Sequence, residues 1–89
     1  MKRQEFIDWA KSQGWEEDRY GHLQMEMSRV EGNHSLGISR YRYKLSRIAV
    51  RKEVRVEHTD GSHDWVRLRS GYFSKLSITA EGKLEGMTR

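Results

Sequence analysis

Four apolar residues recur at helical spacing near the start of the chain: Phe6, Ile7, Trp9 and Ala10. This spacing predicts an amphipathic helix over residues 3–13, with its apolar stripe facing the protein core. Gly14 follows the last turn, and a glycine there can adopt the left-handed conformation that ends a helix. We therefore expect the helix to end at this glycine, with Trp15 folded back on Ala10.

Apolar and polar residues alternate in two later segments, which is the pattern of half-buried β-strands. In the first segment, Leu23, Met25 and Met27 share one side. The second segment alternates three apolar residues with three cations, namely Tyr41, Tyr43 and Leu45 with Arg40, Arg42 and Lys44. Residues 31–37 lie between them and include two glycines and one asparagine, and this composition predicts a loop.

The apolar positions change parity after residue 45, because the next apolar residues all have even numbers: Ile48, Val50, Val54 and Val56. A change of this kind requires one extra residue in the strand. No Gly, Pro or Asn lies near Ser46 and Arg47 to favour a sharp reversal. The sequence therefore predicts a β-bulge at this point, within one long and bent strand.

Residues 59–62 form the clearest turn in the sequence, and the length of its loop decides which side Trp65 occupies. A two-residue loop at Asp60 and Gly61 pairs Val56 with Trp65, which buries the indole but also places an arginine on the apolar side. Burial is the ordinary environment of a tryptophan, which supports this register.

A three-residue loop over residues 59–61 pairs Val54 with Val66 and Lys52 with Leu68, provided that Gly61 is left-handed. We favour this register because it keeps the aliphatic side chains together. It directs three side chains outward, Trp65, Arg67 and Arg69, and sets Arg55 across from the indole. The register that buries Trp65 stays open as the alternative.

These elements predict an α+β fold, in which one N-terminal helix packs on a curved antiparallel sheet of four to five strands, in α-β-β-β-β order. Residues 72–78 predict a last short strand, and residues 80–82 predict a turn before Leu84 and Met87. No linker or low-complexity tract divides the 89 residues, so we expect a single domain over residues 1–89.

The composition excludes several classes of protein. The chain has no cysteine, which excludes disulfides, thiolate catalysis and thiolate metal sites and favours a cytoplasmic location. No apolar segment is long enough for the core of a signal peptide or for a membrane span. No complete catalytic or cofactor motif is present, so we expect neither a cofactor nor an enzymatic activity, apart from the resemblance described below.

Positive charge is concentrated in one segment. Residues 40–75 contain ten Lys and Arg against four Asp and Glu, whereas the whole chain has a net charge of +4. Cationic groups neutralise phosphates, and an exposed indole can stack on an unpaired base. The favoured register therefore predicts a non-catalytic face for single-stranded or looped nucleic acid, formed by Arg40, Arg42, Lys44, Arg55, Trp65, Arg67 and Arg69.

Other interpretations of the same segment stay open. Glu53 and Glu57 lie on the same side as the arginines and can neutralise them in cross-strand ion pairs. A basic surface or a sheet edge can equally dock on an acidic protein, as in a small accessory or inhibitor protein with no nucleic-acid role. The strand that begins at Leu23 could also pair at a sheet edge with a second copy, in a homodimer.

The four histidines give weak indications of chemistry. His58 and His63 flank the turn, but no third ligand is placed beside them, so we expect no metal site. Ser62, His63 and Asp64 are adjacent in the sequence, and neighbouring side chains of a strand point to opposite sides. A hydrolytic triad at these residues is therefore excluded.

Five residues that follow the predicted helix resemble the start of the HicA family of mRNA-cleaving toxins: Gly14, Trp15, Arg19, Gly21 and His22. The resemblance covers about residues 5–24. It implies a fold similar to double-stranded-RNA-binding domains, with His22 as general base or acid at an RNA phosphodiester. The spacing from the Gly-Trp step to the histidine is shorter here, and the C-terminal part lacks the second helix of that fold. A ribonuclease that depends on His22 is thus a further interpretation.

Overall fold

The computed structural model describes the backbone of residues 1–89 and the side chains of residues 1–28, 32–33 and 37–89. The chain forms one α-helix, one 3₁₀ turn and seven strands: α1 (Arg3–Ser12), β1 (Glu16–Glu17), β2 (Leu23–Glu31), β3 (His34–Leu45), β4 (Ala49–Glu57), β5 (His63–Tyr72), η1 (Phe73–Lys75), β6 (Ser77–Ile78) and β7 (Leu84–Glu85). No helix of the described backbone has the length and apolar character needed to cross a membrane.

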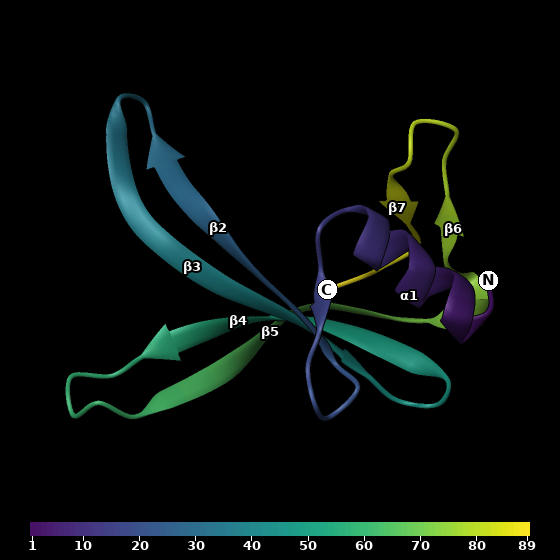
Figure 1. The fold of residues 1–89 in the computed structure, drawn as a ribbon, viewed down its shortest axis with the longest axis horizontal. Coiled ribbons are helices and arrows are strands. Elements are labelled where there is room, and N and C mark those ends of the chain that lie inside the picture. The colour runs from purple at the N-terminus through teal and green to yellow at the C-terminus, as the bar shows by residue number, and fades with distance from the viewer.

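The first five strands form one antiparallel sheet in the order β1-β2-β3-β4-β5, and β6 pairs with β7 in a separate two-stranded sheet. Pairing between β3 and β4 extends only from Tyr41–Val54 to Leu45–Val50. The hairpins β2–β3 and β4–β5 therefore separate toward their tips, away from α1 (Figure 1). The predicted α+β class, with one helix and an antiparallel sheet of up to five strands, is confirmed.

The helix ends where the sequence predicts. Gly14 has a φ of +98°, and the backbone N–H of Trp15 donates to the carbonyl of Ala10 at 3.0 Å. This reversal lays the indole of Trp15 against the ring of Tyr43, with 4.1 Å between the ring centroids. The ring of Phe6 meets the same tyrosine edge-on at 5.0 Å. Tyr43 therefore joins the helix, the chain reversal and the sheet.

The core lies at one end of the sheet. It consists of buried residues from α1, from the helix-proximal ends of β2, β3 and β4, and from η1: Phe6, Ile7, Ala10, Trp15, Leu23, Tyr43, Leu45, Val50, Phe73 and Leu76. We call the sheet face that carries Leu23, Tyr43 and Val50 the core face, and the opposite face the open face. The indole N–H of Trp9 donates to the carbonyl of Gly82 at 2.8 Å, which fixes the β6–β7 turn to the helix.

The bulge predicted near Ser46 is wrong, because the chain reverses there. Leu45 pairs with Val50, so β3 and β4 are two arms of a tight hairpin. The hydroxyl of Ser46 accepts from the N–H of Ala49 at 3.1 Å and donates to its carbonyl at 3.2 Å. A serine side chain can satisfy the backbone groups of a turn in this way, which is why the reversal needs no Gly, Pro or Asn.

The loop predicted over residues 31–37 is also too long. The backbone of β2 continues to Glu31 and that of β3 begins at His34, so only Gly32 and Asn33 connect the two strands. Gly32 has a φ of +58°, which suits a two-residue hairpin turn. Gly32 and Asn33 are exposed, and these turn residues belong to a hairpin rather than to an irregular loop.

The favoured register of the last hairpin is confirmed at its tip and wrong further along. Val54 pairs with Val66 and Arg55 with Trp65, and Gly61 is left-handed with a φ of +88°. Between Lys52 and Glu53, however, the register shifts by one residue. Lys52 consequently faces Arg69 and not Leu68. The alternation does not predict this bulge, because basic and apolar residues occur on both faces of the hairpin. Lys52 shares a face with Val54, and Trp65 shares the other face with Arg67.

Candidate nucleic-acid interface

The open face collects six of the seven residues predicted to bind nucleic acid. Cross-strand rows on this face run Gln24–Arg42–Glu53–Arg67 and Lys44–Arg51–Ser70. Arg55 and Trp65 pair in the next row toward the hairpin tip. Arg69 does not belong to this set, since the bulge places it on the core face, opposite Lys52. The prediction for Arg69 as a member of the open face is therefore wrong.

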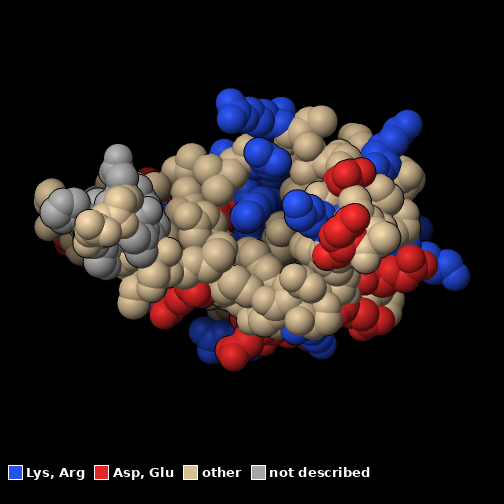
Figure 2. Space-filling view, turned by 90° about the horizontal axis from the view of Figure 1, so that it is seen from above, with Lys and Arg blue, Asp and Glu red and all other residues tan. Residues whose placement is uncertain are grey.

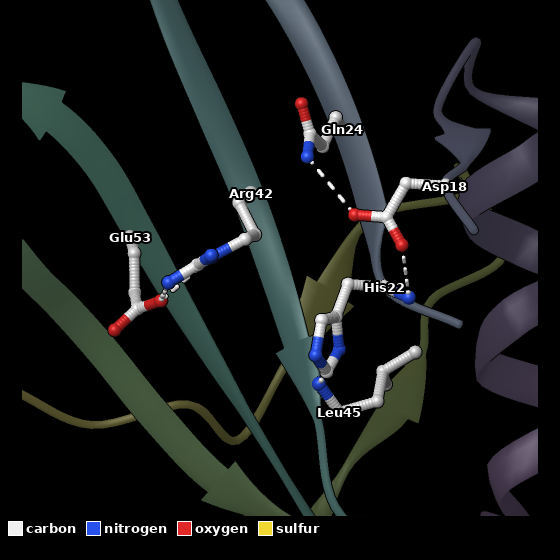
Figure 3. A network of polar contacts seen from close by, with 6 residues as sticks. All are labelled: Asp18, His22, Gln24, Arg42, Leu45 and Glu53. Atoms are coloured by element: carbon white, nitrogen blue, oxygen red, sulfur yellow. Dashed lines mark hydrogen bonds and ion pairs between the residues drawn. The ribbon is translucent and has the colours of Figure 1, made fainter. Parts of the chain in front are cut away.

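Arg42 and Glu53 form a buried ion pair at the centre of this face (Figure 3). Nε and Nη2 of Arg42 donate to Oε1 of Glu53 at 2.9 and 2.7 Å, and Glu53 is 4% exposed. The guanidinium carbon of Arg42 lies 4.2 Å from the centroid of the Trp65 ring. Trp65 therefore lies on the open face, and Arg42 covers one side of its ring. The indole is half-buried, which is intermediate between the exposed and the buried tryptophan that the two registers predict.

Two further predicted ligands of phosphate are ion-paired. The guanidinium of Arg40 contacts the carboxylate of Glu26 on the neighbouring strand. Nε of Arg55 lies 2.7 Å from Oε1 of Glu57, which is two residues along the same strand, although the N–H does not point at that oxygen. Together with Arg42, half of the six predicted cations already face a carboxylate. Their charge is consequently less available to a ligand.

A third group of cations forms no ion pair among the described residues, although Glu53, which is paired with Arg42, lies across from Arg67. Lys44, Arg51 and Arg67 line an open cleft of about 560 Å³, together with the hydroxyl-bearing residues Ser70, Tyr72 and Thr88. All three cations are exposed, and no Asp or Glu lines the part of this cleft that the structure describes. Arg51 was not among the predicted ligands. The alternation already places Arg51 on the same face as Arg55, and the tight β3–β4 turn pairs it with Lys44.

His22 lies at the covered end of the sheet, between β2 and β3 (Figure 3). Its Nδ1 accepts from the backbone N–H of Leu45 at 3.1 Å, and its own backbone N–H donates to Asp18 at 2.9 Å. The half-buried ring therefore accepts a hydrogen bond from the last backbone N–H of β3, and only Nε2 is left for proton transfer. The described backbone contains one α-helix, and the second helix of the HicA-like fold is not part of it.

Asp18 organises the entry to β2. Burial alone would raise the pKa of its carboxyl, but hydrogen bonds from the backbone N–H groups of His22 and Tyr20 and from the amide of Gln24 lower it below the ordinary value. The carboxylate is therefore a structural acceptor that remains ionised.

His58 and His63, the other histidines whose side chains the structure describes, show no arrangement that could hold a metal ion. Nε2 of His58 lies 2.7 Å from Oδ2 of Asp64, across the tip of the β4–β5 hairpin. In the described part of the chain, no three His, Asp or Glu side chains converge on one point. At the other edge of the sheet, β1 covers Leu23 and Gln24 of β2, so a second copy could pair with β2 only from Met25 onward.

Comparisons of the chain with models of protein families, with curated proteins and with solved structures found no match. We therefore infer the function from the positions and charges of the side chains. The decisive contrast lies between the cations that are paired with Glu26, Glu53 and Glu57 and those that are not.

Proposed function

We propose that this protein binds single-stranded or looped nucleic acid on its open face, without catalysing a reaction. The observation that supports the proposal is the cleft lined by Lys44, Arg51 and Arg67, in which three exposed cations lie among hydroxyl groups. Positive groups that are not held in an ion pair retain the charge that displaces counterions from a phosphate backbone. A solvated sheet has no need of three such groups around one hollow.

The phosphates bind in this cleft, where the hydroxyls of Ser70, Tyr72 and Thr88 supply neutral donors beside the cations. Backbone contacts of this kind set the position of a strand but do not select its sequence. We therefore expect weak sequence preference.

The bases lie over the neighbouring row of the sheet. The guanidinium of Arg42 lies over the ring of Trp65 and is fixed by Glu53, so the half-buried indole is held in one orientation. Unpaired bases stack on guanidinium planes and on aromatic rings. We expect the sheet to curve around the bound strand, so that one ligand contacts both the cleft and this stacked pair.

The salt dependence of binding tests the number of phosphate contacts. Three contacts to a single strand give a slope of log affinity against log salt of about −2, whereas six contacts would give about −4. Titrations of labelled single-stranded DNA, RNA and duplex at several salt concentrations, followed by fluorescence anisotropy, measure this slope. A flat dependence contradicts the proposal.

Substitutions distinguish the cleft from the paired arginines. We expect the double variant Arg51→Gln/Arg67→Gln to lose about tenfold or more in affinity for a single strand. The control is Arg40→Gln, which removes a cation that Glu26 already neutralises and should change affinity about twofold at most. Equal losses in the two variants would show that the cleft has no special role.

Docking on an acidic protein is a second candidate function, favoured by a different observation. Val56, Val66 and Leu68 are exposed on the core face. Apolar side chains gathered at a surface often mark a protein interface. Affinity capture from a lysate with and without nuclease separates the two functions, because capture through nucleic acid is lost after digestion.

A further inference from the structure

Two cations face each other on the core face of the sheet. The register shift in β4–β5 places Arg69 directly opposite Lys52, where the sequence pattern predicts Leu68. Like charges at directly opposite positions of a sheet destabilise the pairing. Bulges are frequent beside functional sites, where they redirect a side chain. This bulge therefore places the charge of Arg69, and not the apolar side chain of Leu68, opposite Lys52.

The pair lies in a cleft between the sheet and the C-terminal segment. The cleft has a volume of about 870 Å³, and Arg89 adds a third cation while Glu85 is the only acidic residue among the described residues that line it. Figure 2 shows several Lys and Arg side chains at the middle of the face that it displays, with Asp and Glu side chains beside them. The lining carries a net charge of +2 from these four residues.

The remaining walls of the cleft are aromatic or apolar: Met27, Tyr41, Tyr43, Leu68, Leu84 and Met87. One wall is held by Gly86, whose φ is +104° and where a Cβ atom would collide with the carbonyl oxygen of Lys75. Only glycine allows the segment after β7 to approach η1 this closely. The cleft is thus shaped by a specific backbone contact.

Lys52 is poorly compensated in this cleft. Its Nζ lies 5.6 Å from the ring centroid of Tyr41 and 6.0 Å from that of Tyr43, and no carboxylate pairs with it among the described side chains. Burial, and then the charge of Arg69, lower the pKa of Lys52 below its ordinary value. A bound anion would remove both the repulsion and the lack of a counter-charge.

We propose that this cleft binds a phosphomonoester that also contains an aromatic ring, as a nucleotide does, with the phosphate between Lys52 and Arg69 and the ring against Tyr41. A phosphomonoester carries a charge of about −1.5 to −2 near neutral pH, which matches the charge of the lining. The volume is within the range of small-molecule sites, and apolar walls with a few placed charges are typical of them. The site lies on the opposite face from the cleft of Lys44, Arg51 and Arg67, so it does not depend on the function proposed above.

Isothermal titration of the whole protein with three probes tests this site. Adenosine 5′-monophosphate should bind, inorganic phosphate should bind more weakly because it has no ring, and adenosine should bind at least about tenfold more weakly because it has no charge. Equal affinity for adenosine and its monophosphate overturns the proposal.

Two substitutions locate the binding. Arg69→Gln and Lys52→Gln should each weaken the binding of adenosine 5′-monophosphate by about tenfold or more. The matched control is Arg47→Gln, at the exposed β3–β4 turn, which should leave this affinity unchanged. The unliganded Arg69→Gln protein should melt at the same or a higher temperature, because the repulsion with Lys52 is gone. Unchanged affinity in both cleft variants overturns the proposal, whatever their stability.

A final pair of probes identifies the source of the phosphate. A short single strand with a 5′-phosphate should compete with the mononucleotide, and the same strand with a 5′-hydroxyl should not, if the ligand is a strand end. Competition by neither strand, with retained mononucleotide binding, supports a free nucleotide. Because Arg69 and Arg67 lie on opposite faces, failure here leaves the proposed nucleic-acid function untouched, and the reverse also holds.

Discussion

The two ends of the core face share the same alternation of side chains and differ in what covers them. At the helix end, Leu23 and Val50 are 0% and 1% exposed. At the hairpin end, Val66 and Leu68 are 45% and 39% exposed. An alternating strand therefore creates an apolar face, but burial also requires a second layer over that face.

Length explains why only one end is covered. The ten residues of α1 span about 15 Å, because an α-helix rises by about 1.5 Å per residue. The nine residues of β4 span about 30 Å, because a strand rises by about 3.3 Å per residue. The strand is therefore about twice as long as the helix. Stability is therefore concentrated at the helix end, and the exposed cations and apolar side chains of the other half are available to ligands.

The same substitution at the two ends tests this difference most directly. Leu23→Ala should lower the free energy of unfolding by about 2–5 kcal/mol, since it leaves a cavity in the core. Leu68→Ala should cost about 1 kcal/mol or less, because the side chain is already partly in water. Urea denaturation of both variants measures the two values. Similar losses would show that the hairpin end is as well covered as the helix end.

The centre of the open face should be the next most sensitive position. Glu53→Gln removes the charge that compensates Arg42 and should destabilise the protein by about 2–3 kcal/mol. The control is Glu57→Gln, whose carboxylate is exposed and whose pair with Arg55 contributes about 0–1 kcal/mol. Denaturant midpoints compare the two, and a larger loss in Glu57→Gln would contradict the assignment of Glu53 to a buried pair.

At the helix end, the buried phenol of Tyr43 makes the free energy of unfolding depend on pH in the alkaline range. Burial raises the pKa of Tyr43 to about 12 from the ordinary value of 10.0. The folded protein thus holds a proton that the unfolded chain loses, so stability falls as the pH rises from 10.0 to about 12, by about 3 kcal/mol in total.

Tyr43→Phe should remove this alkaline loss, and Tyr20→Phe, at an exposed residue, should preserve it. The lowered pKa of Lys52 acts in the other direction, since it makes stability rise with pH until the unfolded lysine loses its proton near 10.5. Unfolding midpoints measured across this range separate the two. An unchanged profile in Tyr43→Phe contradicts a buried phenol.

The smallest effect is expected at Asp18, at the margin of the covered end. Its pKa is lower in the folded protein than the ordinary 3.8, so its contribution is present above that pH and is lost as the pH falls through the folded pKa. Asp18→Asn should cost about 0.5–1.5 kcal/mol at neutral pH and weaken the acid dependence below pH 3.8. Asp8→Asn, on the exposed side of the helix, is the control.

The open face could be predicted in outline because alternation is a local property. Arg40, Arg42 and Lys44 share one side of a strand whatever that strand pairs with. Which of them are neutralised depends on the neighbouring strands, and Glu26 and Glu53 reach Arg40 and Arg42 only after the register is set. The cleft of Lys44, Arg51 and Arg67 likewise requires the turn at Ser46, which contains no Gly, Pro or Asn.

By itself, the sequence determined the helix and its end at Gly14, the alternation of the strands, and the three-residue turn at Gly61. Each depends on residues close together in the chain, where spacing and backbone preference act directly. Only the tertiary structure decided the β3–β4 hairpin, the bulge that brings Arg69 to Lys52, and the length of sheet that α1 leaves uncovered. These depend on pairing energies between distant segments, which no local pattern specifies.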